Sequence, residues 1–283
     1  MTKELETKVY QRGNRLHLSQ LVKEVIKDLA TSRFLAFQLA KRDISSSYRQ
    51  SFLGIIWAFI TPISTALVWI FINSSGTVDL KDTGVPYPVF VFTGTLLWSI
   101  LTESINMPLS ATNGAKGLLS KINFPKEALI LSGIYKILFN SIFKFLLLIF
   151  FFLYFQIIPG WNLVFFPFTF LFLMIFGVCL GLWITPLGML YNDVGKAIAM
   201  GLRFVMYVTP VVYTIPDSGI MKTIMEYNPL TPVLVLNRTI ILNQELLFVD
   251  YFLWLVVITL PILLLALVIY RISIPVIVER LSA

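Results

Sequence analysis

Long apolar runs separated by short polar segments dominate the chain. The runs fall at about 53–73, 86–110, 129–156, 163–190, 197–215 and 247–270. A bilayer core offers the backbone no hydrogen-bond partners, so a crossing segment must be a helix of about 20 residues or a strand of a closed barrel. The runs are too long and continuous for strands. The pattern predicts an all-α polytopic membrane protein with six transmembrane helices.

Composition agrees with this class. Hydrophobic residues make up 57% of the chain and charged residues 13%, whereas soluble domains have about half and a quarter. The chain is therefore divided into a cytoplasmic N-terminal part (1–52), a six-helix transmembrane domain (53–270) and a cytoplasmic C-terminal tail (271–283). The first 50 residues are polar and lack the apolar core of a cleavable signal peptide.

Basic residues are distributed unevenly around the apolar runs. With the N-terminus inside, sixteen of the 22 Lys and Arg residues lie in inner segments, and three, Lys81, Lys222 and Arg238, lie in outer ones. Because short cytoplasmic loops carry the excess of Lys and Arg, both termini are predicted to be cytoplasmic. This bias, together with affinity for anionic membrane lipids, explains the net charge of +7, so no nucleic-acid partner is expected.

Apolar residues recur at helical spacing just before the first run. They are Leu21, Val22, Val25, Ile26 and Leu29, followed by Phe34, Leu35, Phe37 and Leu39. The spacing predicts an amphipathic helix, or two helices joined near Thr31–Ser32, lying in the cytoplasmic interface with its apolar side in the lipid. For 19–30, a cytoplasmic helix packed on a partner protein is an equal alternative.

The chain carries few residues suited to catalysis. Cys179 and His17 are the single cysteine and histidine, and neither belongs to a ligand cluster, so no metal site is expected. The sequence has no G-x-x-x-x-G-K-[ST] phosphate loop, and no convergent His/Asp/Glu set indicates enzyme chemistry. We therefore expect a transport subunit that binds no cofactor and hydrolyses no ATP itself.

Several segments resemble one family of membrane proteins. RDISSSYRQSFLGIIWAFITP (42–62) resembles the start of the transmembrane subunit of ABC-2-type exporters for polysaccharides and polyol phosphates. INFPKEALIL (122–131), LYNDVGKAI (190–198) and EYNPLTPVL (226–234) resemble further segments of that family, although LYNDVGKAI has Asn-Asp where many relatives have Arg-Asp. The matching positions of the first segment are Arg42–Asp43, Tyr48–Arg49, Leu53–Gly54, Trp57 and Pro62.

The resemblance implies a homodimer joined to two ATP-binding-cassette ATPase subunits, which would hold the ATP and Mg²⁺. The substrate would be a lipid-diphosphate-linked polysaccharide crossing the bacterial inner membrane. O-antigen is the favoured polymer, and teichoic acid or capsule polymers are alternatives because their permeases have similar motifs. An ion-coupled transporter or a membrane transferase is the alternative from another functional class.

The family places its coupling helix in the inner loop ATNGAKGLLSKINFPKEA (111–128). Asn113–Gly114 can end the preceding helix, and Pro125 suits the first turn of the next. Leu118 and Leu119 are expected to enter a groove of the ATPase. Lys116 and Lys121 would form the polar rim around them. An ordinary connecting loop is the alternative.

The outer segment 216–244 is too polar to cross the membrane and too apolar for a solvated loop. Its pattern indicates two short helices that dip into the outer leaflet, where protein or a water-filled cavity must satisfy the backbone. The resemblance implies that these helices gate the outer exit. An amphipathic lid without a gating role is the alternative.

Polar side chains within the spans mark a transport path, because burying them in lipid is costly. Aromatic rings can stack on the CH-rich faces of sugars, although packing against lipid or protein is their alternative role. The expected channel-lining residues are Tyr48, Trp98, Ser99, Glu103, Asn106, Asn140, Lys144 and Tyr207. Basic residues expected to receive the diphosphate are Lys41, Arg42, Arg49 and Arg203. Snorkelling to the inner headgroups also explains Lys136 and Arg203.

Overall fold

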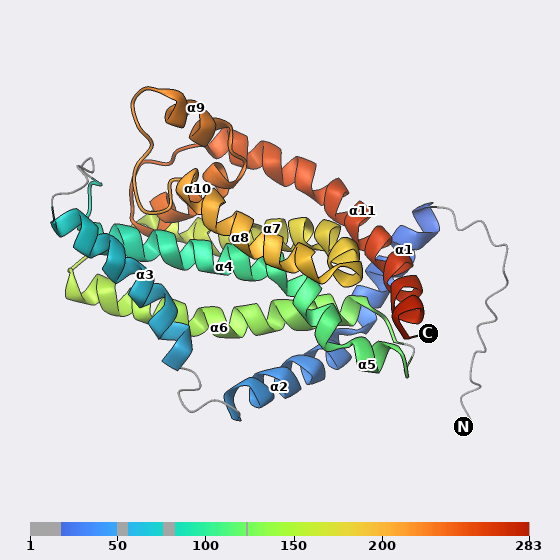
Figure 1. The fold of residues 1–283 in the computed structure, drawn as a ribbon. Helices are drawn as coiled ribbons and strands as arrows, with labels where there is room; N and C mark the ends of the chain where they lie inside the picture. Colours follow the sequence, from blue (N-terminus) through green and yellow to red (C-terminus); the bar gives the residue numbers. More distant parts are fainter. Residues whose placement is uncertain (1–17, 50–55, 76–82, 123, 283) are drawn as a thin grey trace.

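The computed structural model describes residues 18–49, 56–75, 83–122 and 124–282, and every regular element in these ranges is a helix (Figure 1). The predicted all-α class is therefore confirmed for the described residues. The helices are α1 (Leu18–Thr31), α2 (Arg33–Arg49), α3 (Trp57–Ser74), α4 (Tyr87–Gly114), α5 (Lys116–Leu119), α6 (Glu127–Tyr154), the 3-10 helix η2 (Trp161–Phe165), α7 (Phe166–Leu190), α8 (Asn192–Tyr207), α9 (Ile220–Tyr227), α10 (Leu230–Ile241) and α11 (Val249–Ser282).

Four helical segments are long and apolar enough to cross a bilayer. They are α4, α6, η2 together with α7, and α11, and they coincide with four of the six predicted runs. The run 53–73 overlaps α3, which has 18 residues. The run 197–215 only partly overlaps α8, which has 16 residues and ends at Tyr207. By length and composition the described residues therefore support four spans, and the six-span count stays a prediction.

Helix α4 lies at the centre of the bundle and contacts α3, α6, α7, α8 and α10. Its closest approach is to α7, where two glycines one turn apart face it. A Cβ on Gly181 would lie 2.2 Å from the Ile105 carbonyl oxygen, and one on Gly177 would lie 2.6 Å from the Ser104 Cβ. Small residues at this spacing let membrane helices approach closely. The α4–α7 contact thus depends on the absence of side chains at both positions.

The N-terminal amphipathic region forms two helices, as the sequence allowed, with the break at Ser32. The Ser32 hydroxyl donates to the Asp28 carbonyl oxygen, which also accepts the Ser32 backbone N–H at 2.9 Å, and such a side-chain bond often bends a helix. Leu21 and Val25 of α1 are buried in the main core, whereas Phe34 and Phe37 of α2 are exposed. Helix α1 therefore packs on its own chain, and the exposed aromatic side of α2 suits a lipid interface. The expected junction with the first span lies outside the described residues.

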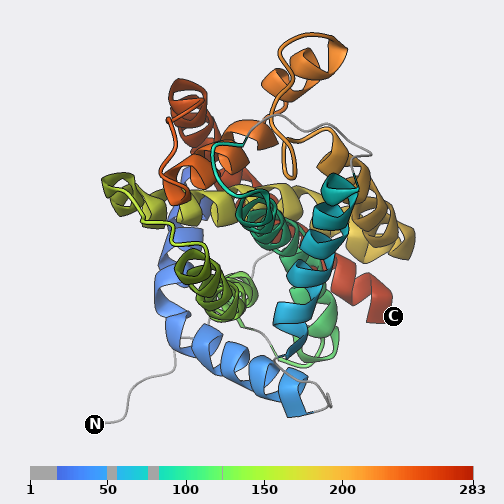
Figure 2. The ribbon, with the colours of Figure 1, turned by 90° about the vertical axis from the view of Figure 1, so that its left-hand side faces the viewer.

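The two ends of the bundle carry different elements (Figure 1). Helices α1 and α5 and the C-terminal end of α11 gather at one end, and α9 and α10 lie towards the other. Figure 2 shows α1 and α2 along one side of the bundle, where α2 runs beside α6. The two short helices expected within 216–244 are present as α9 and α10.

We expect a reporter fused after Ala283 to be cytoplasmic and one inserted at Asp217, in the segment before α9, to be external. The reason is the inside bias of Lys and Arg. Protease protection or alkaline-phosphatase activity in intact cells measures this directly. An external C-terminus would contradict the six-span arrangement.

Candidate functional site

A polar cavity of about 300 Å³ lies between α2, the end of α4 and the start of α6. Arg42 on α2 and Lys136 on α6 both line it. Ser46 and Ser132 add hydroxyl groups, whereas the hydroxyls of Ser47 and Ser110 donate to carbonyl oxygens of their own helices. Asp43 also lines the cavity. Two cations with surrounding hydroxyls form a donor-rich surface of the kind that binds phosphate oxygens.

The two cations of this cavity differ in their partners. The Arg42 side chain donates to Asp43 Oδ1 from Nε at 2.9 Å and from a terminal nitrogen at 2.7 Å. This pair is exposed, with 58% of the Arg42 side chain accessible, so it is worth little in free energy and leaves further donors open. Lys136 is half-buried, and no carboxylate pairs with it among the described residues. The cavity therefore holds a cation that a bound anion could compensate.

Of the basic residues predicted to receive a diphosphate, the structure places only Arg42 in this cavity. Lys41 is exposed outside its lining, and Arg203 is exposed on α8. The Arg49 side chain lies outside the described residues. Lys136 lines the cavity although it was not among the residues predicted to bind the diphosphate. The sequence pattern allowed it either to face the transport path or to snorkel to the headgroups.

Three of the expected channel residues form one polar cluster between α4 and α6. The Lys144 ammonium lies 3.0 Å from Glu103 Oε2, and Asn140 Nδ2 donates to Glu103 Oε1 at 2.9 Å. The Lys144 side chain is 8% exposed and that of Glu103 is 30% exposed. Asn140 and Lys144 lie one helical turn apart on α6, so both can reach one carboxylate. The cluster neutralises its own charges and leaves one side of Glu103 accessible.

The remaining expected channel residues lie in different surroundings. Trp98 is enclosed by the main core, with 7% of its surface accessible. Ser99 and Asn106 are half-buried and donate to carbonyl oxygens of their own helix. Tyr207 is exposed, with its ring 6.4 Å from that of Trp69. The Tyr48 side chain is outside the described residues. The channel-lining role of the whole set stays a prediction.

The predicted coupling loop contains the single-turn helix α5, with α4 ending at Gly114. Leu118 and Leu119 are half-buried against a small apolar cluster of Leu39, Ala115, Ala128 and Leu129, so part of their surface is already covered by this chain. Ile122 is 55% exposed.

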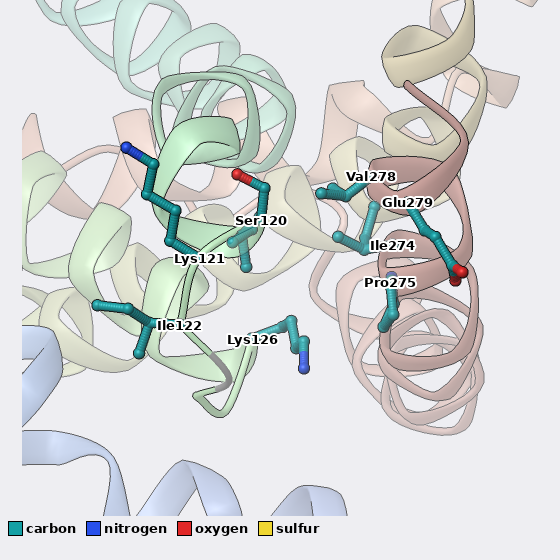
Figure 3. Close-up of a pocket in the computed structure, with 9 residues that line it drawn as sticks. Ser120, Lys121, Ile122, Lys126, Ile274, Pro275, Val278 and Glu279 are labelled. Atoms are coloured by element: carbon teal, nitrogen blue, oxygen red, sulfur yellow. The ribbon is translucent and has the colours of Figure 1, made fainter. Parts of the chain in front are cut away.

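A second cavity, of about 370 Å³, opens between this loop and the last turns of α11 (Figure 3). The loop contributes residues 119–122 and Lys126, and α11 contributes Ile274, Pro275, Val278 and Glu279. Partial burial lowers the pKa of the Lys126 ammonium, and the neighbouring Glu127 opposes that shift. The α11 side of the cavity is apolar apart from Glu279, and the loop side carries Lys121 and Lys126. Its shape and chemistry suit a protruding segment of a partner protein.

Two buried or half-buried arginines were not identified as interaction centres from the sequence. Arg271 on α11 contacts Asp28, Glu127 and Glu24 at 2.6, 2.8 and 3.2 Å. The sequence contains only a weak signal for this cluster. Glu24 and Asp28 lie one turn apart on one predicted helix, and Arg271 follows the last apolar run. Their pairing with Arg271 depends on the tertiary fold.

Arg238 on α10 was assigned to a polar outer segment and is instead 5% exposed. It donates to the carbonyl oxygens of Pro210 and Val211 at 2.7 and 3.1 Å. Its guanidinium carbon lies 4.0 Å from the centre of the Phe90 ring, within the range of a cation–π contact. The residue thereby ties α10 to α4 and to the segment after α8.

Comparison with known proteins adds an independent line of evidence. The family model described as ABC-2 type transporter matches residues 35–242. The O-antigen export system permease protein RfbA of Myxococcus xanthus is 26% identical over 225 residues, which cover 78% of this chain and 85% of that protein. A protein of the same name from Klebsiella pneumoniae is 22% identical over 213 residues, 74% of this chain and 80% of its own length.

We expect Lys144→Met to destabilise the protein more than the double variant Glu103→Gln/Lys144→Met. The single change leaves a carboxylate without its cation in a largely buried site, which costs up to about 3 kcal/mol. Solvent contact of Glu103 reduces this cost. Thermal unfolding of the purified protein in detergent measures the difference.

Lys196→Met is the matched control, because the Lys196 side chain is 83% exposed on α8. It should leave the unfolding temperature unchanged. A double variant no more stable than Lys144→Met would show that the pair does not determine the stability of this site.

Proposed function

The chain belongs to the ABC-2 type transporter family, and we propose that it is the permease subunit of an ATP-driven exporter of O-antigen. The family match over residues 35–242 carries this proposal, and the names of the relatives support the choice of polymer. The substrate would be a polysaccharide linked through a diphosphate to a membrane lipid. It would cross the bacterial inner membrane, with both termini of the permease in the cytoplasm.

In this function the permease performs no chemistry itself. Membership of a permease family indicates a transport subunit, and ATP would be hydrolysed, with Mg²⁺, in a separate ATP-binding-cassette subunit. We propose a homodimer of this chain with two such ATPases, so that the transport path is shared by two copies. Helices α9 and α10 would gate the outer exit, and the core contacts of Arg238 would hold α10 in place.

The cavity between α2, α4 and α6 is the best candidate for receiving the diphosphate. Arg42 and Lys136 would supply charge, and the hydroxyls of Ser46 and Ser132 would supply further donors. The exposed Phe34 and Phe37 of α2 would keep that helix in the lipid interface, next to a substrate whose lipid tail stays in the membrane. The cavity thus lies where a headgroup could enter from the inner leaflet.

Beyond the headgroup site, the polymer would pass the face of the bundle that bears Glu103. This carboxylate and Asn140 present polar groups at mid-helix, and Glu103 keeps 30% of its surface accessible. A charged group so placed needs water or another protein surface rather than lipid. Ion-coupled transport is less well supported, because Glu103 is already paired with Lys144.

The decisive experiment is copurification of this chain with its ATPase, followed by ATP-dependent export of lipid-linked O-antigen in proteoliposomes. Export that requires both subunits and ATP is the expected result. A chain that moves polymer without an ATPase, or that never associates with one, would overturn the proposed function.

We expect Arg42→Gln/Lys136→Gln to reduce export about tenfold or more, because charge-assisted contacts to a phosphate are worth about 1.5–3 kcal/mol each. Copurification with the ATPase should be unaffected. Lys196→Gln, which removes an exposed charge on α8 away from the cavity, is the control and should export normally. Normal export by the double variant would remove this cavity from consideration.

The loop 111–128 is proposed as the ATPase docking element. Its exposed residue Ile122 gives the clearer test, because it is 55% exposed, whereas Leu118 and Leu119 pack on this chain. We expect Ile122→Ser to weaken copurification with the ATPase severalfold, as for an apolar anchor residue in an interface. Leu118→Ala/Leu119→Ala should also weaken it, with an added loss of stability because both side chains pack on this chain. Ile220→Ser on α9, with 81% of Ile220 exposed, is the matched control at the other end of the bundle. Unchanged copurification of Ile122→Ser and the double alanine variant would favour a plain connecting loop.

A further inference from the structure

Two consecutive residues of α11 contact the two helix ends that flank the docking loop. The Tyr270 hydroxyl lies 2.7 Å from the Thr112 hydroxyl, near the end of α4. The Arg271 guanidinium donates to Glu127 Oε1 at 2.8 Å, at the first residue of α6. The loop between α4 and α6 is therefore fastened to α11 on both sides.

The same arginine also holds the N-terminal helix. Arg271 donates to Asp28 Oδ2 at 2.6 Å and to Glu24 Oε2 at 3.2 Å. Asp28 and Glu24 lie one turn apart on α1, so one guanidinium reaches both. Four segments thus meet at this point: α1, the end of α4, the start of α6 and α11. We call Tyr270, Arg271, Thr112 and Glu127, with Asp28 and Glu24, the α11 clamp.

The clamp contacts differ in burial: the Tyr270–Thr112 contact is buried, whereas the Arg271 contacts are partly exposed, with 21% of the Arg271 side chain accessible. Tyr270 and Thr112 are fully buried, and Glu127 is 1% exposed. Glu127 Oε2 has no hydrogen-bond partner among the described residues, so Arg271 carries much of the compensation for this carboxylate. Polar contacts in a low-dielectric interior are stronger than in water, and losing one partner there is costly.

The clamp lies directly next to the proposed docking cavity. Ile274, Pro275 and Val278, which line that cavity, follow Arg271 within two turns of α11. On the other side, Leu119 and Ile122 of the loop line the same cavity. A partner seated there would push on the loop and on α11 together.

We propose that the α11 clamp makes the docking loop, α1 and α11 move as one unit, and that Arg271 is thereby a positioning residue for coupling ATP hydrolysis to export. The proposal rests on the proposed function. Without the clamp, these side-chain contacts would not carry a displacement of the loop to α11 and α1. With it, the displacement reaches α4 and α6, which line the polar cavity, and α1, which leads into α2.

The test compares Arg271→Gln, Arg271→Lys and Tyr270→Phe in the complex of the full chain with its ATPase. We expect Arg271→Gln to lower the amount of polymer exported per ATP hydrolysed about tenfold, while copurification and the ATPase rate are maintained. Arg271→Lys keeps the charge and should recover part of the coupling. Tyr270→Phe removes a single hydroxyl and should give a smaller loss in the same direction. Arg280→Gln, an exposed arginine near the end of the same helix, is the control.

Hydrogen exchange of the same complexes supplies a readout that does not depend on export. We expect faster amide exchange in α1 and in the docking loop of Arg271→Gln, with α9 unchanged. Unchanged exchange in α1 and the loop would overturn the clamp whatever the transport result. Faster exchange with normal export per ATP would show a purely structural contact and would overturn the coupling role. A wild-type complex that exports nothing in response to ATP would instead contradict the proposed function. The amide exchange of α1 and the docking loop would still test whether the clamp joins these elements.

Discussion

A charge placed in the apolar interior of this protein is stable only when its partner lies in the same interior. Lys144 meets Glu103, Arg238 meets two carbonyl oxygens and the Phe90 ring, and Arg271 meets three carboxylates. In each case the partners belong to other segments of the chain. Because an unpaired buried charge is so unfavourable, each pairing also fixes the relative position of the elements it joins.

Close helix packing around α4 makes these pairings possible. Gly177 and Gly181 of α7 let its backbone approach α4, and Gly133 of α6 faces Met107 of α4, where a Cβ would lie 2.1 Å from the sulfur. With α6 so close, Asn140 and Lys144 reach Glu103 without extending into lipid. The glycine positions therefore determine the geometry of the polar groups as well as that of the core.

One small apolar cluster adjoins both cavities. Leu39, Ala115 and Leu129 line the polar cavity, and the same residues with Ala128 form the cluster against which Leu118 and Leu119 pack. Leu119 also lines the docking cavity. The proposed headgroup site and the proposed docking site thus adjoin the same apolar cluster. In such a packed cluster, a shift on one side is transmitted to the other, because interiors have low compressibility.

The sequence by itself determined most of the helices and some of their ends, although α8 ends at Tyr207, short of the end of the run 197–215, and α11 continues to Ser282, beyond the run 247–270. Apolar runs, the break near Thr31–Ser32 and the loop after Asn113–Gly114 are local patterns, because a helix depends on hydrogen bonds and side chains within about four residues. It also marked Glu103, Asn140 and Lys144 as polar groups that needed protein or water around them. The resemblance of 42–62 to ABC-2-type exporters indicated the family that the comparison then showed.

The tertiary structure decided which distant residues meet. Arg42 shares a cavity with Lys136 and not with Arg203, and Arg238 lies in the core although its segment reads as an outer loop. Arg271 joins α1 to the start of α6 across more than half of the chain. Such pairings depend on the rotation and register of whole helices. Those are set by the summed packing of many side chains, and no short window of sequence contains that information.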